Sequence, residues 1–563
     1  MKKIILLFIF SFLLINCKDV VKKEKTTGLI TQKAMVVSAR IEASKIGSEI
    51  LKNGGNAFDA MAATDLALAV AYPFAGNLGG GGFMVYRKAD GEIGALDYRE
   101  KAPLAAERDM YLDNEGNVVK EKSTLGAMAV GVPGTLAGIF TAHKKFGTMP
   151  MSEILKPVID LAKRGVVVTK KQEDRIKNYQ ALFLKANKDS IPLNKNWKEN
   201  DTIKYPALAE TLIRIQQNGV DEFYKGETAK KMVSFIQANG GIITLEDLAK
   251  YEARWRTPVT FKYDNLKIIS MSPPSSGGVA LAQIMKAIEP YDLDQFGHNS
   301  TKSIQVITEA ERRAYADRSF FLGDPDFVTV PQQKLISKEY ATKRMADFSF
   351  EKATKSADVS HGNIEIVESD ETTHYSIIDQ FGNAVSVTTT LNGAYGSKLY
   401  SPELGFFFNN EMDDFSSKPG VPNMFGLIGA KANEIHPEKR MLSSMTPTIV
   451  EKNGKLFMVV GTPGGSTIIT SVLQTILNVH EYKMGMQEAV NAARFHHQWL
   501  PDVVKMEPNS FDKQAISELK DLGYTIDETT SRIIGKVSAI LVLPNASLEG
   551  GADKRGDDTA VGF

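Results

Sequence analysis

Cysteine is almost absent from this 563-residue chain, which contains one. A single cysteine cannot form an intramolecular disulfide, so noncovalent packing must hold the fold together. Neither sign of charge is in excess, because 67 Lys and Arg residues balance 67 Asp and Glu residues. That balance gives no sign of a nucleic-acid-binding surface or an acidic tail. A small neutral or zwitterionic substrate fits this composition at least as well.

Long apolar runs are also absent after the first residues. Residues 4–15 are apolar apart from Ser11 and follow two lysines, which is typical of a signal peptide and too short to span a bilayer comfortably. The run ends in Leu-Ile-Asn-Cys17, which resembles the lipobox of a bacterial lipoprotein. Cys17 is therefore predicted to carry a lipid; the alternative is a spare cysteine in a discarded leader.

These features predict a lipoprotein signal peptide over residues 1–17 and a polar, lysine-rich tether over residues 18–32. We expect an exported lipoprotein of a bacterium, in the periplasm or cell envelope, that meets the membrane only through its lipid anchor. With Cys17 used for the lipid, no cysteine remains for catalysis in the mature fold.

Neither an internal repeat nor a low-complexity tract divides the chain. Helical periodicity predicts helices over residues 42–53, 59–72, 136–145, 151–164, 207–218, 228–239, 303–320 and 466–482. Strand patterns predict strands over residues 83–87, 258–271, 446–451, 455–461 and 537–543. Strand pairs flanked by helix pairs indicate two sheets covered by helices, which is an α/β layered fold.

Three polar segments have ordinary structural interpretations. Residues 309–318 place Glu and Arg three or four apart, a spacing that suits the surface of a helix. Ser275 and Ser276 precede a helix and are interpreted as its N-cap rather than as nucleophiles. Residues 350–371 are polar, and we expect them to be exposed and weakly ordered.

A threonine-rich hairpin is predicted over residues 372–391. Residues 372–379 and 384–391 have strand patterns, and the turn Gln-Phe-Gly-Asn separates them. Because threonine is β-branched and common in strands, the plain interpretation of Thr372 and Thr373 is packing.

The same stretch, ESDETTHYSIIDQFGNAVSVTTTLN, resembles the self-cleavage segment of the γ-glutamyltranspeptidases, a family of N-terminal-nucleophile hydrolases. Further motifs follow in the family's order over residues 36–563. The resemblance implies a four-layer αββα sandwich built jointly by two intertwined subunits. These are a large subunit, residues 33–371, and a small subunit, residues 372–563, cut from one precursor between Glu371 and Thr372 to give a heterodimer.

The chemistry of a threonine at a new N-terminus is self-consistent. A threonine hydroxyl is a weak nucleophile and needs an adjacent base. Cleavage before Thr372 would create an α-amine on the same residue, with an ordinary pKa of about 7.7–8.0. A useful fraction of that amine is neutral near pH 7 and can take the hydroxyl proton directly or through one water. No histidine or aspartate partner is then required.

The resemblance assigns a carboxylate site to Arg99, Ser443 and Ser444. Arg99 stands in an Asp-Tyr-Arg-Glu-Lys-Ala-Pro motif whose arginine binds the substrate α-carboxylate in the family, and the serine pair supports it. A guanidinium can hold a carboxylate through two parallel hydrogen bonds, which lysine cannot do. Without the resemblance, the arginine would be a solvated loop charge and the serines would form a turn.

The resemblance also assigns roles to Thr390, Asn392, Glu411 and Asp414. Thr390 orients the nucleophile, Asn392 contacts the substrate amino group, and the two acids face the substrate α-ammonium. The plain alternatives are strand packing for the first two residues and a water-facing or metal-binding acidic cluster for the others. A hard metal would draw in more oxygen ligands at defined offsets, and the sequence offers none, so no metal is predicted.

Two glycine-rich segments receive different interpretations. Residues 76–82 lack the Lys-Ser/Thr of a phosphate loop and run into a strand, so a turn with closely approaching backbones is the better account. Gly464 and Gly465 lie directly before a helix, where N–H groups can point at one spot and the helix dipole adds to their effect. The resemblance assigns the oxyanion hole to this pair.

Residues 418–440 form a long loop that resembles the lid of many bacterial members. Phe425 stands where an aromatic gate would be, although ordinary loop packing explains it equally well. His496 and His497 are adjacent, and no third ligand has suitable spacing, so we predict a structural role rather than a zinc site. No cofactor is expected.

Together these motifs predict an enzyme of the γ-glutamyltranspeptidase type. Thr372 would attack the γ-carbonyl of glutathione or another γ-glutamyl compound, and water, an amino acid or a dipeptide would take the glutamyl group from the ester. One alternative is a β-lactam side-chain acylase on the same fold. A second is a non-catalytic solute-binding lipoprotein, and a structural surface lipoprotein is the third.

Overall fold

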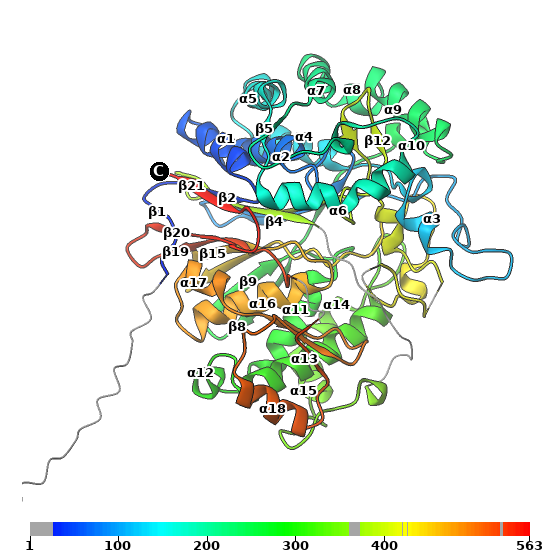
Figure 1. The fold of residues 1–563 in the computed structure, drawn as a ribbon. Coiled ribbons are helices and arrows are strands. Elements are labelled where there is room, and N and C mark those ends of the chain that lie inside the picture. The colour runs from blue at the N-terminus through cyan, green and yellow to red at the C-terminus, as the bar shows by residue number, and fades with distance from the viewer. Residues whose placement is uncertain (1–25, 360–371, 419, 425, 530–532) are drawn as a thin grey trace, which may run out of the picture.

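The computed structural model describes residues 26–359, 372–418, 420–424, 426–529 and 533–563. Two seven-stranded antiparallel sheets lie face to face at the centre, and helices cover the outer face of each (Figure 1). This is the predicted αββα sandwich. None of the helices in these ranges combines the length and apolar character needed to cross a membrane.

The first sheet contains both strands of the threonine-rich hairpin at its centre. Its order is β21 (Thr559–Gly562), β2 (Met35–Ser38), β10 (Thr373–Ile378), β11 (Ala384–Thr390), β3 (Gly81–Arg87), β4 (Ile93–Tyr98) and β7 (Arg254–Arg256). Strands from both predicted subunits therefore share one sheet, with β10 and β11 of the small subunit between β2 and β3 of the large one.

The second sheet has the order β1 (Ile30–Thr31), β20 (Leu548–Ala552), β19 (Ser538–Val542), β15 (Lys455–Gly461), β14 (Thr448–Lys452), β9 (Leu266–Ser270) and β8 (Val259–Tyr263). Three smaller sheets join β5 (Val166–Val167) to β6 (Thr202–Ile203), β12 (Tyr400–Ser401) to β13 (Phe406–Phe407), and β16 (Phe495–His496) through β17 (Val504–Met506) to β18 (Ile526–Asp527).

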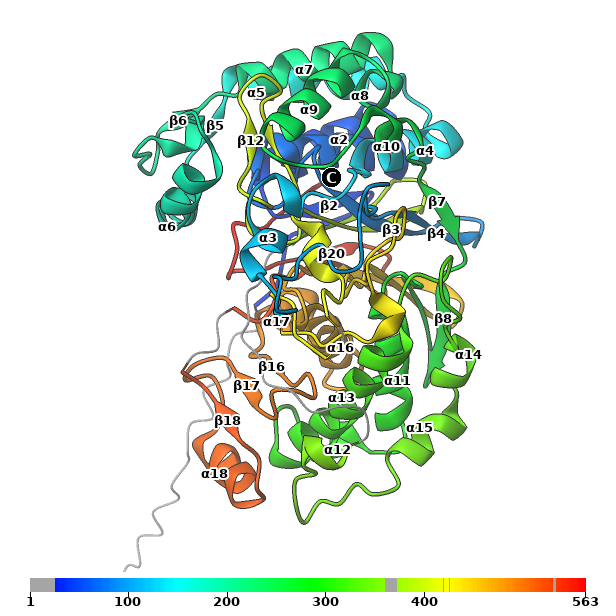
Figure 2. The same ribbon diagram turned by 90° about the vertical axis from the view of Figure 1, so that its right-hand side faces the viewer.

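The helices fall into two groups, one on each side of the paired sheets (Figures 1 and 2). On the side of the first sheet are α1 (Ile41–Lys52), α2 (Ala57–Ala71), α4 (Thr135–Phe146), α5 (Met151–Arg164), α6 (Lys170–Ala186), α7 (Pro206–Asn218), α8 (Asp221–Tyr224), α9 (Glu227–Ala238) and α10 (Leu245–Ala249). On the side of the second are α11 (Gly277–Ile288), α12 (Leu293–Phe296), α13 (Thr301–Phe321), α14 (Gln332–Leu335), α15 (Lys338–Arg344), α16 (Thr467–His480), α17 (Met486–Asn491) and α18 (Lys513–Asp521). The short α3 (Lys120–Thr124) lies at one edge, near the segments that follow β11.

Side chains that point alternately to the two faces of the central strands explain how each sheet packs against helices on one face and against the other sheet on the other. In β10, Tyr375 and Ile377 belong to the apolar cluster shared with α1 and α2, whereas Ile378 belongs to the cluster between the sheets. Val459 of β15 packs into that inner cluster, and Val460 packs outward with α16. A strand buried on both faces needs apolar side chains pointing both ways, which accounts for the near-continuous apolar runs.

Two interpretations from the sequence are wrong. Residues 258–271 form two strands rather than one, because Asp264 adopts a positive φ of 48° and turns the chain between β8 and β9. Helix α13 is buried along most of its length, including the charged residues of 309–318. Their partners come from distant segments, which the local spacing could not show.

Candidate active site

Thr372 is the first described residue after residue 371 and leads directly into β10. It is 4% exposed. In the register of the hairpin Thr373 faces Thr389, so Thr372 lies across from the end of β11 at Thr390. Glu371, Cys17 and Phe425 lie outside the described residues, so cleavage before Thr372, lipidation of Cys17, the aromatic gate and the subunit boundaries stay predictions.

The hairpin turn shows why this strand forms where it does. The Asp379 carboxylate accepts the N–H groups of Phe381 and Asn383, at 2.9 and 2.8 Å, and also the N–H of Ala57 in α2. Gly382 adopts a φ of 90°, which only glycine takes without strain. Local turn chemistry thus sets the register that places Thr372 opposite Thr390.

Close packing between the two sheets positions the glycine pair relative to the hairpin. A Cβ on Gly461, at the end of β15, would lie 2.3 Å from the ring of His374 in β10. The Ser386 hydroxyl of β11 donates to the carbonyl of Val460 at 3.1 Å. The segment that leaves β15 toward Gly464 therefore starts over the first residues of β10, at His374, two residues after Thr372.

Gly464 and Gly465 have backbone conformations that favour glycine, with φ angles of 138° and 51°. Their carbonyls accept the N–H groups of Thr467 and Ile468, at 2.9 and 3.3 Å, and so begin α16. Neither glycine N–H donates to an acceptor in the part of the chain that the structure describes. Two unengaged donors at a helix N-terminus suit an oxyanion hole.

The Arg99 guanidinium is buried and held by acids that come 312 and 315 residues later. Nη1 donates to the carboxylate of Glu411, and Nη2 donates to that of Asp414 at 2.5 Å. Both acids lie in the 3-10 helix η4 (Glu411–Asp414). The predicted carboxylate-binding cation and the predicted ammonium-binding acids therefore meet, and they form ion pairs with one another.

The electrostatics of this group are dominated by burial. Burial raises the pKa of Glu411 well above its usual range, against the lowering effect of Arg99 and with a further rise from Glu100. Burial raises the pKa of Glu100 to about 7. Both oxygens of Glu100 lack a hydrogen-bond partner among the described residues, and one lies 3.9 Å from Arg99. Sequence reasoning passed over Glu100, although it is adjacent to Arg99.

Ser443 and Ser444 are buried beside this group. The Ser443 hydroxyl oxygen accepts the N–H of Met445 at 3.1 Å. The backbone carbonyl of Ser443 accepts both the N–H and the hydroxyl of Ser276. Ser276 stands at the predicted N-cap position of α11, although its own side chain makes no capping bond; the Ser275 hydroxyl oxygen accepts the N–H of Gly277 at 3.0 Å instead. The Ser444 hydroxyl oxygen accepts from Arg318 of α13 at 3.0 Å. Sequence reasoning did not single out Arg318.

Asn392 and the loop of residues 418–440 meet at the same site. The Asn392 N–H donates to the Thr390 hydroxyl at 2.8 Å, and its side-chain amide donates to the carbonyl of Asn410 at 3.0 Å. The amide also lies 3.7 Å from the sulfur of Met424. Loop residue Asn423 donates to Asp414 at 3.0 Å. This loop therefore borders the predicted substrate-binding residues, and Met424 contacts them in the part that is described.

Other predicted features have structural explanations. A Cβ on Gly80 would lie 2.0 Å from the carbonyl of Thr390, which confirms that the glycine run of residues 76–82 allows a close backbone approach. His496 and His497 are buried, and burial lowers the pKa of each, to about 3 and about 4. Among the described residues no group of His, Cys, Asp and Glu side chains could hold a metal ion.

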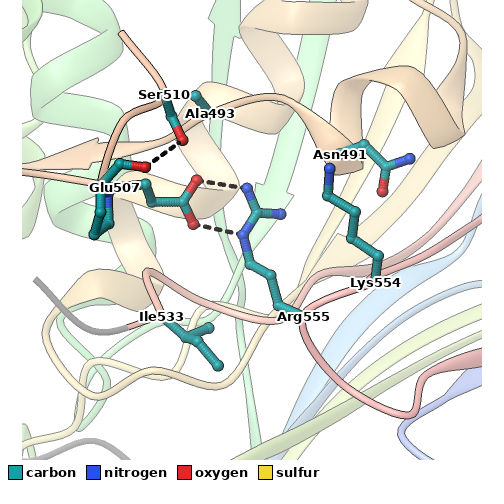
Figure 3. A pocket seen from close by; sticks show the side chains of 8 residues that line it. Asn491, Ala493, Glu507, Ser510, Ile533, Lys554 and Arg555 are labelled. Carbon is teal, nitrogen blue, oxygen red and sulfur yellow. Dashed lines mark hydrogen bonds and ion pairs between the residues drawn. The ribbon is translucent and has the colours of Figure 1, made fainter.

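A separate surface pocket of about 470 Å³ lies between Glu507 and Lys554 (Figure 3). Its guanidinium, Arg555, is fully engaged, because Nε and Nη2 donate to the two oxygens of Glu507 at 2.5 and 2.6 Å. The Nη groups of Arg555 also donate to the carbonyls of Val490 and Ala492. The ion pair therefore stabilises the surrounding loops, and the N–H groups of Arg555 are used within the protein rather than offered to a ligand.

An αββα sandwich with Thr372 at the head of a central strand, and with a glycine pair at the start of α16 whose N–H groups are unengaged among the described residues, has the architecture of an N-terminal-nucleophile hydrolase. The sequence model described as Gamma-glutamyltranspeptidase matches residues 43–563. A glutathione hydrolase proenzyme of Escherichia coli (strain K12) is 45% identical over 539 residues, which is 94% of this chain and 92% of that protein. The chain belongs to the γ-glutamyltranspeptidase family.

Solved structures agree with the sequence comparison. The crystal structure of Helicobacter pylori γ-glutamyltranspeptidase superposes with a TM-score of 0.56 at 43% identity and covers 60% of this chain and 96% of that one. A cephalosporin acylase from Bacillus halodurans gives a TM-score of 0.86 and covers 98% of this chain and 99% of that one. At 22% identity that second likeness shows the fold alone.

Proposed function

We propose that this chain is a γ-glutamyltransferase and glutathione hydrolase that matures by cleaving itself between Glu371 and Thr372. The observation that carries the proposal is the assembly of Arg99, Glu411 and Asp414, which matches the two charges of a γ-glutamyl donor. Sequence identity of 45% with a glutathione hydrolase proenzyme supports the same conclusion.

Maturation follows from the position of Thr372. Its Oγ attacks the Glu371 carbonyl, the peptide C–N bond breaks, and an ester replaces the amide. Water hydrolyses that ester, which leaves a carboxylate on Glu371 and an α-amine on Thr372. The new amine then serves as the base for the neighbouring hydroxyl.

Turnover repeats the same chemistry on the donor. The Thr372 Oγ attacks the γ-carbonyl, and its proton passes through the α-amine to the leaving amine. The N–H groups of Gly464 and Gly465 stabilise the negative charge that develops on the carbonyl oxygen. Water, an amino acid or a dipeptide then attacks the γ-glutamyl ester, releases the glutamyl group and returns the proton to Thr372.

Donor recognition follows from the ion pairs of the site. A donor α-carboxylate can take the place of the acids on Arg99, and its α-ammonium can take the freed carboxylates of Glu411 and Asp414. Each buried charge therefore keeps a partner, which avoids the large cost of an unpaired buried ion. Asn392, close to these acids, is placed to contact the same ammonium.

The acid pair argues against the alternative of a β-lactam side-chain acylase. A glutaryl side chain carries a carboxylate but no amine, so it would leave Glu411 and Asp414 without a cationic partner. A non-catalytic solute-binding lipoprotein would keep the pocket but would not be cleaved. Gel electrophoresis of the purified protein under denaturing conditions distinguishes a self-cleaving enzyme from such a binder. Two bands indicate maturation, and one band indicates a binder or a stalled precursor.

The direct test of activity uses γ-glutamyl-p-nitroanilide. We expect the mature protein to release p-nitroaniline, and a dipeptide acceptor such as glycylglycine to increase that release. Glutaryl-p-nitroanilide should react far more slowly. Faster reaction with the glutaryl compound would reverse the choice between transpeptidase and acylase.

Arg99→Lys is expected to weaken donor binding more than catalysis. Lysine keeps the charge but loses the two parallel hydrogen bonds, so the KM for γ-glutamyl-p-nitroanilide should rise by about 10–100-fold. The kcat at saturating donor should change by less than about threefold if the lost contact is a uniform binding contact. Steady-state kinetics measure both values, and an unchanged KM would remove Arg99 from the carboxylate site.

Glu100→Gln is expected to change the pH dependence of donor binding. In the wild type, Glu100 takes up a proton as the pH falls through about 7, and burial also raises the pKa of Glu411, so KM should rise as the pH falls because less negative charge faces the donor ammonium. The negative charge of Glu100 raises the pKa of Glu411, so its removal lets Glu411 ionise at lower pH. The rise in KM should therefore move to lower pH by about one unit. The test measures KM for hydrolysis by the wild type and by Glu100→Gln between about pH 5 and about pH 8.5, a range that brackets neutrality. The same dependence of KM on pH in both proteins would contradict the prediction.

Residues 1–17 support a further proposal, that the protein is an exported lipoprotein anchored through Cys17. Cys17→Ser removes the only thiol that can be acylated. Expressed in a Gram-negative host, the wild type should sediment with membranes and the variant should not, with equal γ-glutamyl activity in both. Membrane association of the variant would contradict the anchor.

We also propose that residues 418–440 form a lid over the site, with Phe425 as its gate. The support is that two residues of this loop, Asn423 and Met424, contact Asp414 and Asn392.

A further inference from the structure

Arg318 lies on the buried face of α13 and is 3% exposed. Its Nε donates to the Ser276 hydroxyl at 2.8 Å, and its Nη2 donates to the Ser444 hydroxyl at 3.0 Å. Ser276 in turn donates to the carbonyl of Ser443 at 2.6 Å. The Arg318 guanidinium therefore contacts the Ser444 hydroxyl directly and is linked through Ser276 to the backbone carbonyl of Ser443.

Arg318 differs from the other buried arginines of this helix. Arg312 pairs with Asp502, and Arg313 pairs with Glu309 and Asp347. No described carboxylate lies within ion-pair distance of Arg318, whose described hydrogen bonds go to hydroxyl groups. Burial lowers the pKa of Arg318 to about 10, so it is still charged at neutral pH. A buried cation without an acid partner is costly, and a ligand anion nearby would offset that cost.

The hydrogen bonds also fix the direction of the two serine hydroxyls. A hydroxyl offers one donor and two acceptor positions. Ser444 Oγ accepts from Arg318, and Ser443 Oγ accepts from the N–H of Met445, so each oxygen has used an acceptor position. Neither hydroxyl proton is donated to an acceptor within the described part of the chain. Both protons are therefore available to an incoming anion.

We propose that Arg318 is a positioning residue that orients the Ser444 hydroxyl as a donor, holds the Ser443 backbone in place through Ser276, and adds positive charge for the donor α-carboxylate, so that it selects donors carrying that group. This deepens the proposed function and rests on it. Asp414 and Arg99 lie within range of its field, so the site combines two guanidinium groups with the acids of η4. Arg99 makes the direct contact, and Arg318 acts through the serines.

The test replaces Arg318 by methionine, which fills the space without charge or donors. The KM for γ-glutamyl-p-nitroanilide should rise by about tenfold or more, because hydrogen bonds that involve charged groups are lost, and kcat should change far less. Arg318→Lys keeps the charge and should recover part of the effect. Arg313→Met is the matched control, since Arg313 is also 3% exposed on the same helix but is paired with acids away from the serines.

A binding measurement keeps the proposal separate from turnover. L-glutamate should raise the melting temperature of the mature wild type more than 4-aminobutyrate, which lacks the α-carboxylate, and Arg318→Met should abolish that difference. Ser276→Ala, which removes the acceptor of the Arg318 Nε–H and its relay to Ser443 but keeps the bond to Ser444, should reduce it. Should Arg318→Met retain the wild-type preference for L-glutamate, or should Arg313→Met lose it equally, Arg318 has no such role. A wild type that prefers L-glutamate but releases no p-nitroaniline would refute the proposed activity and leave this inference standing.

Discussion

Thr372→Ala is expected to yield one uncleaved chain with activity reduced by about 10⁴-fold or more, as loss of a nucleophile usually does. Alanine has no Oγ to attack the Glu371 carbonyl, so no ester forms and no new α-amine is released. The same missing oxygen removes the acyl acceptor of turnover. Denaturing gel electrophoresis and p-nitroaniline release from γ-glutamyl-p-nitroanilide read the two effects separately.

The neighbouring threonine provides the matched control. Thr373 is buried in β10, and its hydroxyl lacks a partner among the described residues. Thr373→Val keeps the shape of the side chain and removes a hydroxyl that contributes little, so it should be cleaved and active. Two bands from Thr372→Ala, or a smaller fragment of the wild type that begins elsewhere than Thr372, would show that the nucleophile has been assigned wrongly.

The hairpin could be predicted from the sequence because its information is local. Asp379, Gly382 and Asn383 contact one another within five residues, and alternating apolar side chains specify two strands buried on both faces. The order of strands in the sheets could not be predicted in this way. The inner strands β10 and β11 are flanked by β2 and β3, which come more than 280 residues earlier.

The ion pairs within the site could not be predicted from the sequence either. The family resemblance gave Arg99, Glu411 and Asp414 their separate roles, but only the structure shows that they pair with one another. Residues 309–318 were assigned to a helix surface because Glu and Arg recur at helical spacing. Such spacing is equally compatible with burial when partners such as Asp502 and Ser444 come from other segments.

Gly464→Ala is the variant expected to have the second-largest effect, a fall in kcat of about 10²–10³-fold, which is typical for the loss of an oxyanion-hole donor. At a φ of 138° an alanine is strained, and its Cβ would lie 2.5 Å from the Thr467 hydroxyl in the first turn of α16. The backbone must rotate to relieve that contact, which turns the N–H away from the developing negative charge. Steady-state kinetics should show a nearly unchanged KM.

Gly454→Ala controls for the general cost of a side chain at positive φ. Gly454 has a φ of 77° in the turn between β14 and β15, and a Cβ there would meet no atom within 4 Å. Its substitution should cost about 1 kcal/mol of stability and leave kcat unchanged. Both substitutions put a side chain at positive φ, but only Gly464→Ala also brings a Cβ against a neighbour and so turns the N–H assigned to the oxyanion hole. A similar fall in kcat for both variants would mean that the Gly464 N–H does not stabilise the oxyanion.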